Sequence, residues 1–356
     1  MSAVFTNINL SRIILHNVFP PDDEGRVEPV TSHELTLLGE KALGKLEERL
    51  TAVLGRGSKC IEMEIVNTTA DGCFARACNI LRTDNTDFIE QSAGFAEKHT
   101  DAHTSKGWPG GTLVVIDATV GPHAKHCLII IKAERQEGFI ERAQSDNVMM
   151  EYVENLLLTP QTKLYKVGVF VEKEQVGEAE NEPNPARFSA YVFDSNITQK
   201  DERRAASYFY SNFLGLRVPQ QAKHQTRNFF EATTRFIDQS ELSTEEKVDL
   251  HNALYTYMKT DQSNVVEVGG FAASYLGDEH RDDYEAYMLG EGISENAIVK
   301  DTSLIAGKLR LRKLNFSSNV KVSAPADQFA DLINVIEAGV ESTTVRIQGR
   351  LLDQIS

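Results

Sequence analysis

The segments "GGTLVVIDATV" at residues 110–120 and "KHCLIIIKAE" at residues 125–134 are two apolar runs rich in Val and Ile. Runs of this length, bounded by Gly, Pro and charged residues, are typical of β-strands. The connection between them, "GPHA", is short and contains two residues that favour turns. The two segments therefore predict a pair of adjacent antiparallel strands, and the rest of the N-terminal half is interpreted around this pair.

Further strands and two helices are predicted on both sides of this pair. Alternating or β-branched patterns predict strands at 8–19, 60–66, 163–171 and 187–194. Apolar residues three and four apart predict a helix within 33–54, which ends at "GRG", and residues 86–103 have a helical pattern. Residues 1–195 are therefore expected to form a mixed, largely antiparallel α/β domain.

The pattern changes to helices from residue 197 onward. Ala205, Phe209 and Phe213 are spaced by four before Gly215, and "STEE" at 243–246 is a capping box that begins a later helix. Helices are predicted from Pro219 to about 238 and near 265–276 and 282–290, and strands at 308–316, 319–323 and 343–348. The fold class is therefore α+β, with a helical region at 196–292 and a small β-rich segment at 293–356.

Composition sets limits on the class of protein. The 356 residues include 41% apolar and 25% charged residues, which is ordinary for a globular protein. The apolar runs have strand length, so no membrane span is expected, and the N-terminus lacks the pattern of a secretory signal. Four cysteines match no zinc or disulfide spacing. We expect a cytoplasmic protein.

The net charge of −15 is distributed unevenly. Residues 172–182 contain five Glu and one Lys, whereas residues 308–321 contain five basic residues and no acidic one. Between 200 and 235, seven Lys and Arg stand against three Asp and Glu. Local basic surfaces can contact phosphates even in an acidic protein. The candidate DNA-binding residues are Lys200, Arg203, Arg204, Arg217, Lys223, Arg227, Lys308, Arg310, Arg312 and Lys313.

Each basic stretch also has a structural interpretation. The first is equally typical of a solvated helix face. On a strand at 308–316, Lys308, Arg310 and Arg312 would share one face, which could follow a phosphate backbone or protect an exposed edge strand against aggregation.

A metal-dependent hydrolase is the competing hypothesis. His99 and His103 are four residues apart, as in helical zinc motifs, but Thr100 stands where a zincin has its catalytic Glu. Histidines at the surface near a helix end explain the pair more simply. There is no Walker A loop, no GxGxxG motif and no legible carboxylate cluster. We therefore expect no catalytic residue, no metal and no cofactor.

The order of several segments resembles the bacterial 37-kDa nucleoid-associated protein family. The similar pieces are "IILHNV", "GGTLVVID…CLIIIKAE", "RFSAYVFD…RRAASYFYSNFLGL…AKHQTRNFFEATTRFI", "NALYTYMK" and "LRKLNFSSNVKVSAP…STTVRIQG". They span nearly the whole chain in family order, and no catalytic motif is among them. The resemblance implies a non-enzymatic DNA-binding protein of the bacterial nucleoid.

Two further expectations concern partners. We expect double-stranded DNA as the ligand and a homodimer as the assembly, because Tyr208 and Tyr210 fall away from the apolar stripe and would need covering. The acidic segment 172–182 could compete with DNA for a basic groove. An alternative role is that of a nucleic-acid-binding subunit, with a protein partner, in a larger assembly such as an anti-phage defence system.

Overall fold

A computed structural model describes residues 4–55, 58–144, 147–157, 166–173, 183–194, 207–261, 263–339 and 341–350. The chain divides into two compact units, Met1–Pro219 and Gln220–Ser356. Helices and a large antiparallel sheet confirm the expected α+β class. The division into three segments at 195 and 292 stays a prediction.

The first unit is built on a seven-stranded sheet in the order β1-β3-β4-β7-β8-β2-β9. Its strands are antiparallel to their neighbours and are β1 Asn9–Val18, β2 Ile61–Ile65, β3 Gly111–Val120, β4 Lys125–Ala133, β7 Lys166–Glu172, β8 Phe188–Asp194 and β9 Leu216–Arg217. The β3–β4 pair is confirmed, with Val114 opposite Ile131 and Val120 opposite Lys125.

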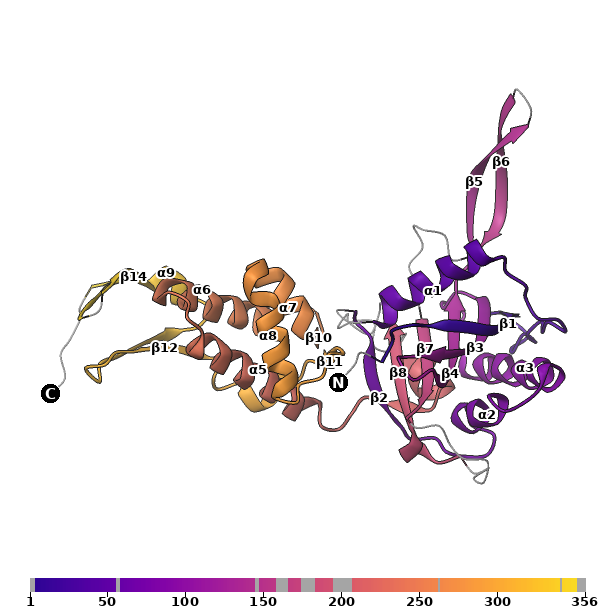
Figure 1. Cartoon of the computed structure of the whole chain (residues 1–356), viewed down its shortest axis with the longest axis horizontal. Coiled ribbons are helices and arrows are strands. Elements are labelled where there is room, and N and C mark those ends of the chain that lie inside the picture. Colours follow the sequence, from indigo (N-terminus) through magenta and orange to yellow (C-terminus); the bar gives the residue numbers. More distant parts are fainter. Residues whose placement is uncertain are drawn as a thin grey trace. The chain divides into compact units, whose positions relative to one another are not determined.

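Helices cover both faces of this sheet (Figure 1). On one face α1 Glu40–Leu54 packs Leu46, Leu50 and Leu54 into the same core as Val114 and Ile116 of β3. On the other face lie α2 Cys73–Ile80 and α3 Asn85–Ala102. Because both faces are covered, β3 and β4 are nearly continuous apolar runs and do not alternate between apolar and polar residues. Such runs could be recognised in the sequence.

A two-stranded hairpin follows β4 and was not predicted. It consists of β5 Gln136–Gln144 and β6 Asn147–Leu156 (Figure 1). Phe139 lies opposite Tyr152 in this hairpin, and their ring centroids are 5.3 Å apart. Phe139, Met150 and Tyr152 are exposed by 65%, 76% and 47%.

The segment η2 Tyr208–Phe213 is a π-helix, and this corrects the expectation for Tyr208. Phe209 and Phe213 are buried as predicted, and Gly215 with φ of 70° follows the helix. Tyr208 is 2% exposed, so it does not face outward. The bond from Leu214 N to Phe209 O spans five residues, and such wide turns bring Tyr208 to the inner side.

The second unit has a helical core and a smaller β-rich part. The helices are α5 Ala222–Gln239, α6 Thr244–Tyr255 with its π-helical continuation η3 Thr256–Thr260, α7 Val268–Tyr275 and α8 Asp278–Gly290. The capping box at Ser243 and Glu246 is present as predicted. The remaining short elements are β10 Val265–Val266, β11 Ile298–Val299, η4 Thr302–Ile305 and, in the first unit, η1 Pro185–Arg187.

Two hairpins and a short helix form the C-terminal part of this unit. The hairpins are β12 Leu311–Asn315 with β13 Lys321–Pro325, and β14 Ile333–Ala338 with β15 Thr343–Ile347. Helix α9 Phe329–Leu332 lies between them in sequence, and Phe329 and Ile333 anchor a small core of their own. No helix within the described ranges is long and apolar enough to cross a membrane.

Candidate nucleic-acid interface

The candidate basic residues fall into three groups. Lys200, Arg203 and Arg204, like most of the acidic segment 172–182, lie outside the described residues. Arg217 belongs to the first unit, where its Nη2 atom is 2.7 Å from Oε2 of Glu64. The second unit holds the other six candidates, Lys223, Arg227, Lys308, Arg310, Arg312 and Lys313.

Three cations from two distant parts of the sequence meet at Glu231 of α5. Lys308 Nζ is 2.9 Å from Glu231 Oε1. Arg227 and Arg235 stand four residues before and after Glu231, which places them on the same helix face. All three cations hold the pKa of the Glu231 carboxyl below its usual value, with the hydrogen bond from Lys308 as the main cause. Glu231 therefore lies within the influence of three positive charges.

The expected strand face with Lys308, Arg310 and Arg312 is not formed, which corrects the sequence prediction. Strand β12 begins only at Leu311. Lys308 and Arg310 lie in the turn before it, where Lys308 N and Leu309 N donate to Ile305 O and Arg310 N donates to Gly307 O. Leu309 is buried in the helical core, and this anchor holds the turn against α5.

Within β12 the side chains alternate between two environments. Arg312 is half-buried, and its guanidinium carbon lies 4.2 Å from the centroid of the Phe329 ring. Burial lowers the pKa of Arg312 from its usual value, and it remains charged at neutral pH because an arginine titrates far above that range. Lys313 and Asn315 are exposed, and they point to the opposite side of the strand from Arg312.

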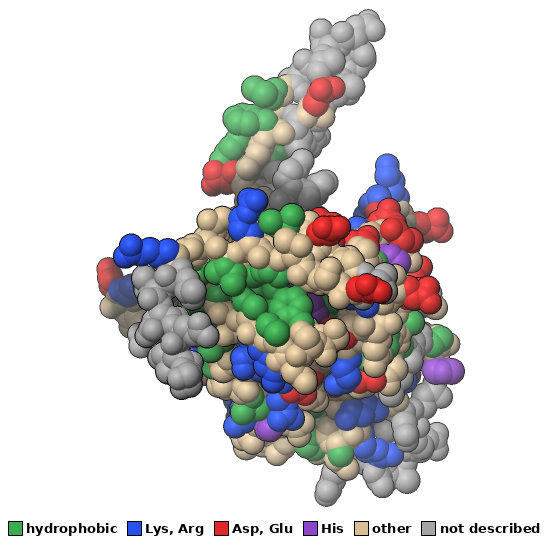
Figure 2. All heavy atoms as spheres, turned by 90° about the vertical axis from the view of Figure 1, so that its left-hand side faces the viewer, with side chains coloured by type: hydrophobic (Ala, Val, Ile, Leu, Met, Phe, Trp, Pro, Cys, Tyr) green, Lys and Arg blue, Asp and Glu red, His purple; other side chains and the backbone are tan. Residues whose placement is uncertain are grey.

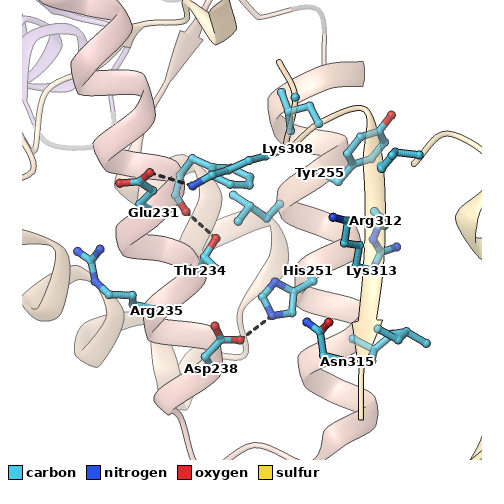
Figure 3. Close-up of a pocket in the computed structure, with 17 residues that line it drawn as sticks. Glu231, Thr234, Arg235, Asp238, His251, Tyr255, Lys308, Arg312, Lys313 and Asn315 are labelled. Atoms are coloured by element: carbon cyan, nitrogen blue, oxygen red, sulfur yellow. Dashed lines mark hydrogen bonds and ion pairs between the residues drawn. The ribbon is translucent and has the colours of Figure 1, made fainter. Parts of the chain in front are cut away.

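A groove of about 740 Å³ separates β12 from α5 and α6 (Figure 3). Its apolar lining comes from Phe230, Val248, Leu254, Tyr255, Leu309, Leu311 and Leu314. Its cations are Arg235, Lys308, Arg312 and Lys313, and its carboxylates are Glu231 and Asp238. The groove therefore combines an apolar interior with an excess of positive charge.

The two carboxylates of the groove are already engaged. Glu231 pairs with Lys308, and Asp238 Oδ1 is 3.0 Å from Nε2 of His251 on α6. Arg235 pairs with Glu291 of the segment after α8. Arg310, Arg312 and Lys313 form no ion pair with any residue that the structure describes. Of these three cations, Arg310 and Lys313 are also exposed.

Basic side chains border hydrophobic ones on the surface. In the view of Figure 2, Lys and Arg side chains lie beside a patch of hydrophobic side chains. Lys223 at the start of α5 is exposed, and Arg227 is half-buried with its Nε atom unpartnered within the described structure. The basic surface is therefore local, as an acidic chain requires if it is to bind a polyanion.

The histidine pair lies in a different environment from the one expected. His99 and His103 are 0% and 2% exposed, so they are not surface histidines. The reason is aromatic packing: Tyr208 stacks on Trp108 at 4.4 Å and on His103 at 5.5 Å. In the described ranges, no group of three or more His, Cys, Asp or Glu residues gathers around one point.

Burial also sets the protonation of this cluster. It lowers the pKa of both histidines, and the nearby Lys132 ammonium lowers it further. Burial lowers the pKa of Lys132 to about 8, although its Nζ donates to the carbonyls of Pro109 and Gly110. Neither ring nitrogen of His99 has a partner within the described structure. The cluster is a packed core with neutral imidazoles.

Sequence reasoning missed the groove itself. Phe230, His251, Tyr255 and Asp238 come from two helices, and none of them belongs to a recognisable motif. The available signal was weak: these residues lie on the helix sides that do not carry the main apolar stripe. The basic segment 308–313 was recognised, and its position beside α5 was not.

One family of proteins matches the chain over almost its full length. The NA37 family model, described as nucleoid-associated protein YejK, matches residues 14–354. No curated protein is similar enough to the chain to count as a match. The match includes both units and all of the groove residues. The resemblance inferred from the sequence is confirmed, and the chain belongs to the NA37 family of nucleoid-associated proteins.

Proposed function

We propose that this protein binds the phosphate backbone of double-stranded DNA in the bacterial nucleoid, without catalysing a reaction. The family supports a nucleoid-associated role. The observation that carries the proposal is the ion pair between Lys308 and Glu231, which joins the two basic stretches of the second unit on one surface. The convergence gathers cations of both stretches on one surface, and a local basic surface suits a polyanionic ligand.

The charges of this surface suit phosphates better than base edges. Arg310 and Lys313 are exposed and unpaired within the described structure, and Lys223 is exposed on α5. Flexible cations of this kind neutralise phosphates and carry little sequence information. The acidic remainder of the chain would restrict binding to this surface. Lys200, Arg203 and Arg204 are proposed to extend it.

A salt titration on duplex DNA tests the proposal. The logarithm of the binding constant should fall linearly with the logarithm of the salt concentration, with a slope of about −0.9 for each phosphate neutralised. Lys313→Gln should make this slope less steep by about 0.9, whereas Lys41→Gln, an exposed lysine of α1, should leave it unchanged. Absence of duplex binding at low salt would refute the proposal.

We also propose a homodimer, with a changed physical basis. Tyr208 is buried within its own unit and cannot form the interface. Three exposed hydrophobic residues, Phe139, Met150 and Tyr152, lie on the β5–β6 hairpin. They share one face, because Phe139 pairs with Tyr152 and Met150 pairs with Glu141, two residues from Phe139. An isolated two-stranded hairpin is only marginally stable in water, so a second copy would stabilise it. Subunit membership in a larger assembly remains the alternative.

A further inference from the structure

The groove between β12 and the helices α5 and α6 has more apolar lining than phosphate binding requires. Phe230, Leu254 and Tyr255 line one side and Leu309 and Leu311 line the other. Phosphate contacts need cations and N–H donors, which an open surface can supply. A concave site with apolar side chains in its interior is typical of a pocket that encloses part of a ligand. The groove is therefore suited to a ligand with an apolar part and an anionic part.

The volume of the groove limits what can enter. About 740 Å³ is within the range of roughly 300–1,000 Å³ in which proteins enclose small organic groups. A duplex keeps its bases stacked and paired, and extruding one base costs free energy. A single strand presents unpaired bases that can enter a groove without this cost.

We propose that the groove binds an unpaired base of a single-stranded nucleic acid, while the neighbouring phosphates contact Lys308 and Lys313. This inference rests on the proposed nucleic-acid binding. Lys308 projects from the turn before β12 towards Glu231 of α5, and its Nζ lies 6.0 Å from the centroid of the Phe230 ring (Figure 3). Lys313 is on the exposed side of β12. Positive charge thus lies next to an aromatic interior.

The polar groups of the groove fit a neutral base better than an acidic peptide. Asp238 and Glu231 are both on the α5 wall, and they would repel carboxylates that entered beside them. A base carries exocyclic amino or imino N–H groups, and such carboxylate oxygens can accept hydrogen bonds from them. Asn315 makes no side-chain hydrogen bond within the described residues, and its amide offers both a donor and an acceptor. An amide of this kind can pair with the edge of any base.

The test compares three labelled probes on the full chain: an oligothymidylate, an abasic strand of the same length, and a duplex. Base contacts predict that the wild-type protein binds the oligothymidylate at least about fivefold more tightly than the abasic strand. A variant with Thr234→Met and Asn315→Met fills the groove from two walls and keeps every cation. It should lose this preference and bind the duplex as the wild type does.

A matched control carries Thr256→Met and Thr343→Met, which are exposed positions outside the groove, and should behave as the wild type. The inference is overturned if the wild type binds the abasic strand as tightly as the oligothymidylate, because only charge would then be recognised. It is also overturned if a folded groove-filling variant keeps the preference. Failure of the wild type to bind any of the three probes refutes the proposed function itself, whereas binding of the duplex alone refutes only this inference.

Discussion

Nζ of Lys308 lies 2.9 Å from Oε1 of Glu231, and this contact joins the turn before β12 to the middle of α5. The two residues are 77 positions apart in the sequence. Arg227 and Arg235 lie on the same face of α5 as Glu231. The Glu231 carboxylate therefore joins Lys308 to the helix face that carries Arg227 and Arg235.

Glu231→Gln should strengthen binding to duplex DNA. The change removes the negative charge among Arg227, Arg235 and Lys308 and releases Lys308 from its ion pair. We expect an increase in affinity of roughly two- to fivefold at low salt, because an exposed pair is worth at most about 1 kcal/mol. Fluorescence anisotropy of a labelled duplex measures this affinity. Glu241→Gln, an exposed carboxylate outside the groove, is the control; equal effects of both changes would mean that only net charge matters.

Arg203→Glu combined with Arg204→Glu should weaken DNA binding without unfolding the protein. The sequence places both residues on the polar side of the helix that carries the stripe Ala205, Phe209 and Phe213. If both contact phosphates, the slope of log K against log salt should decrease by about 0.9 for each lost contact. Equal affinities of wild type and double variant at low salt would exclude this segment from the interface.

His99→Phe should reduce the loss of stability in acid. His99 is fully buried, neither ring nitrogen has a partner within the described structure, and it packs edge-on against Phe213 at 5.2 Å. Its pKa in the folded state lies well below 6.5, because burial disfavours the charged form. Below pH 6.5 the unfolded chain therefore binds a proton that the folded chain does not, and the free energy of unfolding falls by about 1.4 kcal/mol per pH unit for this group.

Urea unfolding at pH 7, 6 and 5 measures this effect. Trp108 is the only tryptophan, and it stacks on Tyr208 in the same cluster, so its fluorescence reports on the first unit. The variant should match or exceed the wild type at pH 7 and should lose less stability at pH 5. An identical pH dependence in both proteins would contradict the account, because it would mean that His99 binds protons equally in the folded and unfolded chains.

Phe139→Ser combined with Met150→Ser should convert a dimer into a monomer. Both side chains are exposed on the β5–β6 hairpin, where Figure 2 shows hydrophobic and acidic side chains. Exposed apolar side chains that lie together are typical of an interface. Light scattering at micromolar concentration should give two chains for the wild type and one for the variant. Leu37→Ser, at a position exposed by 92%, is the control, and a monomeric wild type would contradict the proposed assembly.

Local patterns predicted much of the fold. The β3–β4 pair, α3, α5 and the capping box of α6 all follow from residues close together in sequence. The β5–β6 hairpin escaped because the sequence of a ribbon outside the main sheet does not need to alternate between a buried and an exposed face. The wide turns of η2 also escaped, since a spacing of four assumes a regular α-helix and places Tyr208 outside the core.

The candidate site was predictable only in its composition. The basic residues of 308–313 were recognisable, but the bond from Lys308 N to Ile305 O makes a turn where alternation suggested a strand. The groove depends on Phe230, Asp238, His251 and Tyr255, which come together only when α5 and α6 pack beside β12. Such tertiary proximity has no signature in a single sequence.

The most direct test of the central claim is the salt dependence of duplex binding for a triple variant with Lys308→Gln, Arg310→Gln and Lys313→Gln. These three residues lie together in the segment next to α5, and they include two cations that form no ion pair within the described structure. If all three contact phosphates, the slope of log K against log salt should become less steep by about 2.7, and affinity at low salt should fall. A folded triple variant with the affinity and slope of the wild type would contradict the assignment of this surface to DNA.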